Sequence, residues 1–114
     1  MRVTSDLWVS ALLKRIFSDG GFATIRRRGA REAGAIFLIR RTRLGELHFY
    51  GPAPQTSYDE AKPDDRQFTH VTTTTEEADI ERHLEKEMRF DPDVWIVEVE
   101  MDSDISDYLA LATD

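Results

Sequence analysis

The chain has 114 residues, of which 40% are hydrophobic and 32% charged, and its formal net charge is −7. This balance is typical of a folded domain, and the length predicts a single domain over residues 1–114. The sequence lacks cysteine, which excludes disulfides, cysteine-ligated zinc and thiol nucleophiles. No apolar run approaches the ~20 residues that cross a bilayer and no secretory signal is recognisable, so we expect a cytoplasmic protein.

Residues 5–21 predict the first helix. Ser5 or Asp6 can cap its start, because a short oxygen-bearing side chain accepts from the free amides of the first turn. The glycine pair at 20–21 ends it, since glycine tolerates the left-handed conformation after a helix. The apolar residues that recur every four positions are Trp8, Leu12 and Ile16.

Three strand-like runs follow, at residues 22–28, 33–42 and 46–50. The short glycine-bearing segments between them favour two hairpin turns and an antiparallel meander. Four consecutive apolar residues, Ile36 to Ile39, indicate a central strand that is at least partly covered on both faces.

Residues 51–66 match neither a helix nor a strand. Loops longer than ~12–15 residues are uncommon in compact domains and often functional. Two of the prolines and Tyr58 favour an ordered segment that packs on the sheet and presents Asp59 and Arg66. A second interpretation, a segment that only covers the sheet edge, stays open.

The remaining residues predict a strand at 67–73, a helix at 74–90, a strand at 93–101 and a short helix at 103–113. Thr74 and Glu77 fit a capping box at the start of the helix predicted at 74–90. The order is therefore α-β-β-β-loop-β-α-β-α. We predict an α+β domain with an antiparallel sheet of about five strands and helices packed on one face.

Charge is distributed unevenly along the chain. Residues 1–50 hold ten Lys/Arg and four Asp/Glu, a balance of +6, whereas residues 51–114 hold five and eighteen, a balance of −13. This asymmetry indicates either a polarised surface that selects a partner by charge, or two halves that neutralise each other in the fold.

Arginine dominates the positive charge around the first two strands, and arginine makes planar bidentate contacts with phosphate and carboxylate. We therefore predict a surface that docks an anionic partner. A protein partner is favoured, and nucleic acid is the weaker alternative, because aromatic residues that stack on bases are not clearly interleaved with the arginines. The alternative for the arginines is a charged strand edge that resists aggregation. The predicted binding residues are Arg26, Arg28, Arg40, Arg41, Tyr58, Asp59 and Arg66.

Other chemistry has weak signals. The three histidines, His48, His70 and His83, have no metal-site spacing, and whether they converge is left open by the sequence. Serine-hydrolase and glycine-rich nucleotide-binding motifs are absent. We therefore predict no metal and no cofactor.

Four stretches together resemble a family of short alphaproteobacterial proteins known as a domain of unknown function. They are SDLWVSALLKRIFSDGGFATIRRRG, EAGAIFLIRR, YGPAPQTSYDEAKPDDRQF and FDPDVWIVEVE. The resemblance covers nearly the whole chain and implies a free-standing bacterial cytosolic protein. It implies no activity and no catalytic residue.

The function is thus predicted as a non-enzymatic binding or adaptor module. One alternative is a small enzyme with a pocket between residues 51–66 and the sheet, using Tyr58, Asp59, His48 or His70. Another is a structural homo-oligomer, for example a homodimer that uses Ile36 or Leu38. No membrane association is expected.

Overall fold

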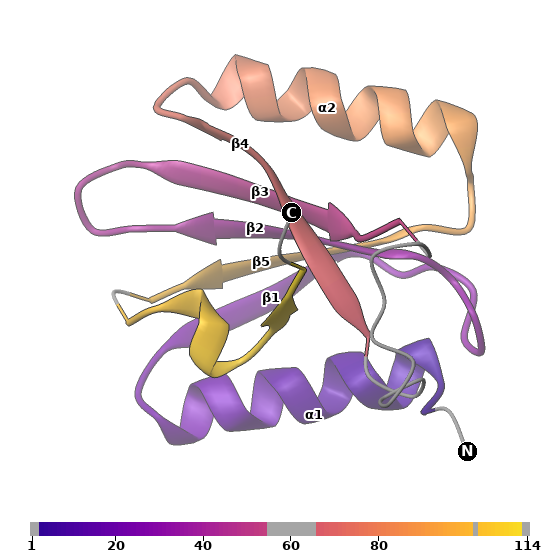
Figure 1. Ribbon diagram of the computed structural model, residues 1–114, viewed down its shortest axis with the longest axis horizontal. Coiled ribbons are helices and arrows are strands. Elements are labelled where there is room, and N and C mark those ends of the chain that lie inside the picture. The colour runs from indigo at the N-terminus through magenta and orange to yellow at the C-terminus, as the bar shows by residue number, and fades with distance from the viewer. Residues whose placement is uncertain (1–2, 55–65, 102, 113–114) are drawn as a thin grey trace.

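A six-stranded sheet lies between two helices in the computed structural model, which describes residues 3–54, 66–101 and 103–112 (Figure 1). The predicted α+β class and the order of elements up to the last long strand are confirmed. The described elements are α1 (Ser5–Ser18), β1 (Phe22–Arg27), β2 (Ile36–Arg41), β3 (Leu47–Pro52), β4 (Gln67–Thr74), α2 (Glu77–Phe90), β5 (Trp95–Glu100), the 3-10 turn η2 (Ile105–Asp107) and β6 (Ala110–Leu111).

The sheet is mixed, so the predicted antiparallel sheet of about five strands is wrong in part. Its order is β1-β5-β2-β3-β4-β6. The β2–β3 hairpin forms as expected, but β5 lies between β1 and β2, antiparallel to the first and parallel to the second. Periodicity identifies strands but carries no information on which distant strand will be a neighbour.

The segment between β1 and β2 explains why these strands do not form a hairpin. It wraps around the start of β5, where the Ala30 amide donates to the Asp93 carbonyl at 3.0 Å. The Trp95 indole donates back to the Ala30 carbonyl at 2.8 Å. A side chain at Gly29 would collide with the Asp93 carbonyl oxygen, so this glycine permits close contact between two backbones rather than a tight turn.

The helices cover opposite faces of the sheet, and the prediction that they share one face is wrong (Figure 1). Leu38 and Val97 face α1, whereas Ile39 and Ile96 face α2. Alternate residues of the apolar runs in β2 and β5 therefore fill two separate cores, and each core needs its own cover.

The predicted C-terminal helix is also wrong. Residues 105–107 make a single 3-10 turn, and β6 then pairs in parallel with the start of β4. Ile105 and Leu109 are buried in the α1-side core. The C-terminal segment thus pairs with β4, whereas α1 packs nearest to β1 at the other edge of the sheet.

Both helix starts differ in detail from the expected caps. Thr4, one residue earlier than expected, caps α1 by accepting from the Leu7 amide at 3.3 Å. Ser5 is buried within the helix, and its hydroxyl donates to the Gly34 carbonyl at 2.6 Å. Glu76 occupies the N-cap of α2, while the Thr74 hydroxyl donates to Asp79 in the first turn at 2.7 Å.

Candidate functional site

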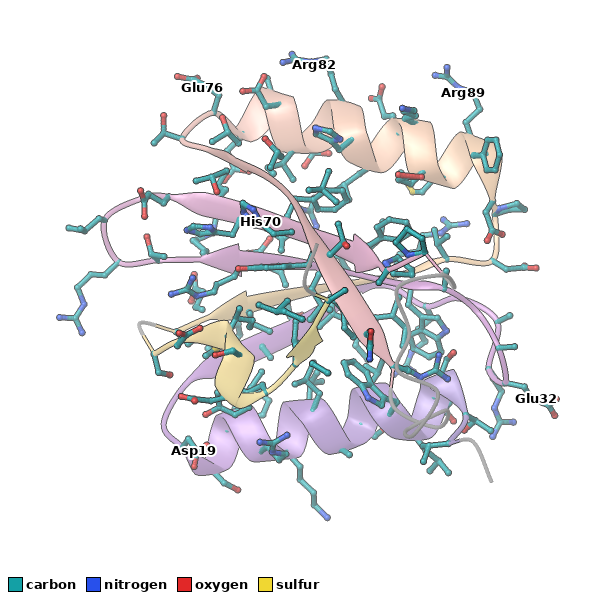
Figure 2. The ribbon with its side chains drawn as sticks, viewed as in Figure 1. Asp19, Glu32, His70, Glu76, Arg82 and Arg89 are labelled. Carbon is teal, nitrogen blue, oxygen red and sulfur yellow. The ribbon has the colours of Figure 1, made fainter. Side chains whose placement is uncertain are left out.

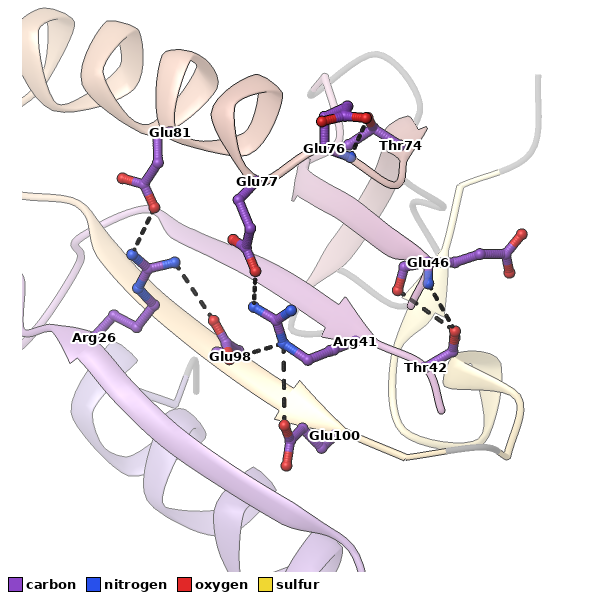
Figure 3. A network of polar contacts seen from close by, with 10 residues as sticks. All are labelled: Arg26, Arg41, Thr42, Glu46, Thr74, Glu76, Glu77, Glu81, Glu98 and Glu100. Atoms are coloured by element: carbon purple, nitrogen blue, oxygen red, sulfur yellow. Dashed lines mark hydrogen bonds and ion pairs between the residues drawn. The ribbon is translucent and has the colours of Figure 1, made fainter. Parts of the chain in front are cut away.

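Two of the predicted binding arginines belong to an ion-pair network on the α2 side of the sheet (Figure 3). Arg26 on β1 contacts Glu81 of α2 at 2.9 Å and Glu98 of β5 at 3.4 Å. Arg41 on β2 contacts Glu77 of α2 at 2.6 Å and the other Glu98 oxygen at 3.4 Å. Glu98 is therefore the junction of the network, because β5 lies between the two arginine-bearing strands.

This network neutralises part of the charge asymmetry between the two halves of the chain. Basic side chains from the first half of the chain meet acidic side chains from the second half. Burial alone would lower the pKa of Arg41, but its hydrogen bonds and charge interactions with Glu77 and Glu98 raise it. Donor groups of Arg26 and Arg41 are already directed at carboxylates of the same chain, which leaves less of their bonding capacity for a partner.

The other predicted binding residues lie apart from this network. Arg28 is exposed beyond the end of β1. The guanidinium of Arg66 donates to the Val3 carbonyl at 2.8 Å. Arg40 precedes Arg41 on β2, so strand alternation places its side chain on the α1 side of the sheet. Tyr58 and Asp59 lie outside the described residues.

His48 on β3 and His70 on β4 converge on the α1 side, which answers a question that the sequence left open. Their ring centroids are 5.6 Å apart. The hydroxyl of Thr73 lies between the rings, 3.1 Å from His48 Nδ1 and 2.8 Å from His70 Nε2. His83 does not join them, since it packs against Phe49 in the α2-side layer. Figure 2 marks His70 beside β3 and β4.

Tyr50 and Arg40 extend this cluster across β3 and β2. The Tyr50 ring lies 5.2 Å from that of His70, and the nearby Arg40 side chain acts to lower the pKa of the Tyr50 hydroxyl. Arg40 is the cross-strand neighbour of His48. Its Nε is buried and has no hydrogen-bond partner among the described residues. We call these five residues the His48–His70 site: Arg40, His48, Tyr50, His70 and Thr73.

The surroundings of the site shift the pKa of several groups. Partial burial lowers the pKa of His70, and the charge of His48 lowers it further, although a hydrogen bond to the Thr72 backbone opposes both effects. Burial raises the pKa of Tyr50, while Arg40 opposes this shift. Asp104, before η2, has a lowered pKa because Ser106 donates hydrogen bonds to it, and the charge of Arg40 adds to this effect. The free protein thus disfavours a second positive charge on the histidine pair.

Comparison with known families matches residues 3–108 to the family described as protein of unknown function (DUF1491). The chain belongs to this family. The expected resemblance to a family of short alphaproteobacterial proteins is thereby confirmed. A comparison with curated proteins gave no match.

Solved structures agree with the DUF1491 assignment. A protein from A. tumefaciens, solved in solution, is 40% identical, with a TM-score of 0.83 over 100% of this chain and 98% of that one. A DUF1491 family protein from Caulobacter crescentus is 31% identical in a crystal structure, with a TM-score of 0.77 over 99% of this chain and 100% of that one. An NMR structure of a DUF1491 family protein from the same organism is 30% identical, with a TM-score of 0.78 and 99% coverage of both chains.

The convergence of His48 and His70 had one signal in the sequence. The two residues lie on strands that follow one another along the chain, and consecutive strands are often neighbours in a sheet. Their shared face could not be derived by counting, because Val71 is an extra residue in β4: Tyr50 pairs with His70, but Phe49 pairs with Thr72. Periodicity alone therefore gave no register between these strands.

Two further findings concern metals and membranes. Within residues 3–54, 66–101 and 103–112, no three metal-ligating side chains of His, Asp or Glu are grouped closely enough to hold an ion. Neither α1 nor α2 has the length and apolar character that a bilayer-crossing helix requires, and the described residues contain no other candidate.

Proposed function

We propose that the protein is a non-enzymatic binding or adaptor module that docks an anionic protein partner at the His48–His70 site. The observation that carries this proposal is the gathering of donor side chains from β2, β3 and β4 around Arg40. The buried Nε of Arg40 has no partner in the described part of the chain. This atom is closed to solvent, as are the Nε atoms of Arg27 and Arg66, so an anionic group would accept from the terminal nitrogens of the Arg40 guanidinium.

The docking surface proposed here differs in its centre from the surface predicted from sequence. Arg26 and Arg41 are engaged with glutamates, so Arg40 is the arginine of this region that we expect to contact the partner. Arg28, Arg66, Tyr58 and Asp59 stay predicted contributors. A cytoplasmic location and a homodimer also stay predictions.

A pull-down from bacterial lysate, read by mass spectrometry, tests the proposal. The baits are the wild type, Arg40→Gln and the matched control Arg26→Gln, which loses an arginine of the α2-side network. We expect a protein that the wild type and Arg26→Gln capture and that Arg40→Gln loses. Identical capture by all three baits contradicts the proposal, and loss of the captured protein after nuclease treatment would replace the protein partner by nucleic acid.

A small enzyme is the second candidate, because two of the histidines expected for it do converge. However, two cavities of about 500 and 450 Å³ that the described residues form are not lined by any residue of the His48–His70 site. Enzyme sites are usually enclosed clefts. This candidate predicts turnover of an ester or phosphate ester that is lost in His70→Gln and retained in His83→Gln.

A further inference from the structure

We propose that the group recognised at the His48–His70 site is a phosphoryl group in its dianionic form, and that its binding draws a proton onto the histidine pair. This inference rests on the proposed function, because it names the anionic group that the same site takes. It concerns a group rather than a particular partner: phosphate on a protein side chain and free phosphate share this chemistry.

The donor set suits the charge and the several acceptor oxygens of a phosphoryl group. Arg40 offers a planar guanidinium that can hold two oxygens of one phosphoryl group. His48 and His70 supply ring nitrogens on neighbouring strands, and the Thr73 hydroxyl lies between them. A phosphoryl group carries about −1.5 to −2 charges at pH 7 and three acceptor oxygens, whereas a carboxylate has one charge and two oxygens. Donors on three strands can bond to more acceptor oxygens than a carboxylate has, so this site favours a phosphoryl group.

The hydrogen bonds of Thr73 connect the two histidines to one another. The Thr73 hydroxyl has one proton and two lone pairs, so it either donates to one ring while the other ring donates to it, or accepts from both rings in their matching neutral tautomers. When both rings are protonated, all of their ring nitrogens are donors, and neither ring can accept from the Thr73 hydroxyl. An anion that accepts from both rings replaces this internal arrangement and favours their protonated forms.

The charges that face the pair set the direction of the effect. Glu46, just before β3, lies 3.6 Å from His48 Nε2, and Arg40 faces the site from β2. The Tyr50 ring packs against both histidine rings, while Asp104 interacts with Arg40 from the loop before η2. Without a ligand, the charge of His48 lowers the pKa of His70. A bound dianion reverses the balance of charge and raises the pKa of His70, so it binds more tightly as pH falls.

Histidine NMR provides the test, because the chain contains a matched internal control. Spectra of the three imidazole rings are recorded during titration with inorganic phosphate, with sulfate and with acetate. Sulfate keeps two charges throughout the range from pH 7.5 to 5.5, so its affinity reports on protonation of the protein alone. We expect phosphate and sulfate to shift the signals of His48 and His70 and to raise the pKa of His70. His83, on the other face of the sheet, should not respond.

Two quantitative results would support the inference. Sulfate affinity should rise as pH falls, by up to about tenfold per pH unit for one proton taken up. Arg40→Gln and His70→Gln should each weaken sulfate binding at least severalfold, while Arg26→Gln leaves it unchanged. The amide spectrum of each variant shows whether it is folded, and Arg40→Lys, which keeps the charge but loses the planar fork, should bind with intermediate affinity.

Other outcomes overturn the inference and are distinct from failure of the proposed function. If acetate shifts His48 and His70 as strongly as sulfate does, the site is not selective for a phosphoryl group. If affinity does not change with pH, no proton is taken up. In either case an Arg40-dependent protein partner would leave the proposed function intact. Equal responses of all three histidines would show nonspecific ion binding, and the inference would be wrong.

Discussion

At the scale of single residues, Glu98 is the most buried carboxylate of the ion-pair network on the α2 side. Its side chain is 18% exposed and accepts from two arginines whose side chains are 31% and 30% exposed. Removing one partner of a partly buried ion pair leaves the other charge uncompensated. Glu98 therefore contributes more to folding than the surface glutamates that complete the network.

We predict that Glu98→Gln lowers the free energy of unfolding by about 1–2 kcal/mol, which is less than for a fully buried pair because solvent screens the arginines. Glu81→Gln is the control, since Glu81 is 49% exposed and its loss should cost under about 0.5 kcal/mol. Urea unfolding at low salt measures both. Equal effects would show that Glu98 is no more than another surface charge.

His70 provides a second prediction at this scale. Burial and the charge of His48 lower the pKa of His70 in the folded protein, so the unfolded chain binds its proton more readily. Stability should therefore fall as pH decreases through and below about 6.5, the ordinary value for histidine. In His70→Gln this part of the decrease should be absent.

The measurement for His70 is urea unfolding at several pH values between 7.5 and 5. His83→Gln serves as the control, because His83 lies away from the pair against Phe49. A wild-type pH profile that His70→Gln leaves unchanged would contradict the prediction.

At the scale of elements, local patterns were sufficient to predict most helices and strands. The four-residue spacing in α1 and α2 and the apolar runs of β2 and β5 identify these elements without any knowledge of their neighbours. The spacing of Ile105, Tyr108 and Leu109 led to the wrong prediction of a C-terminal helix. A 3-10 turn followed by a short strand buries the same apolar residues as a helix would. Short segments carry too few periods to distinguish the two.

The candidate site was predictable only in part. Arg40 was named, but it was grouped with Arg41, although neighbouring residues of a strand point to opposite faces. His48 and His70 were named as residues of an alternative enzyme, but their meeting depends on the β3–β4 pairing and on the bulge at Val71. Contacts between strands separated by a long connection are not encoded in the spacing of either strand.

The C-terminal segment gives the prediction at this scale. Leu109 is 3% exposed in the α1-side core, whereas Leu111 on β6 is 37% exposed. We predict that Leu109→Ala lowers the free energy of unfolding by about 2–4 kcal/mol and Leu111→Ala by under about 1 kcal/mol. Chemical denaturation measures both, and a small effect of Leu109→Ala would mean that the segment is not part of the core.

At the scale of the whole molecule, the position of β5 explains why basic residues from the first half of the chain form ion pairs with acidic residues from the second half. Because β5 lies between β1 and β2, Glu98 meets Arg26 and Arg41 from both sides. The arginine on the other face, Arg40, escapes this pairing and faces the histidines instead. The same topology thus accounts for the neutralised network on the α2 side and for the position of Arg40 in the His48–His70 site on the α1 side.

The topology also ties the two cores together. Leu38 and Ile39 are neighbours on β2, both are 0% exposed, and they face different cores. Loss of packing on one face should therefore destabilise the strand that both faces share. We predict that Ile39→Ala, in the α2-side core, lowers the free energy of unfolding by about 2–5 kcal/mol and shifts one single transition.

The tryptophans make this prediction testable, because both report on the core that Ile39 does not face. Trp95 is buried in the α1-side core and Trp8 packs against it. Fluorescence should therefore follow the α1-side core, while far-ultraviolet circular dichroism follows both helices. If the cores are one cooperative unit, the two signals of Ile39→Ala have the same shifted midpoint, and Leu38→Ala behaves alike. If α2 instead unfolds at lower denaturant while the tryptophan signal keeps its wild-type midpoint, the two cores are independent and β2 does not couple them.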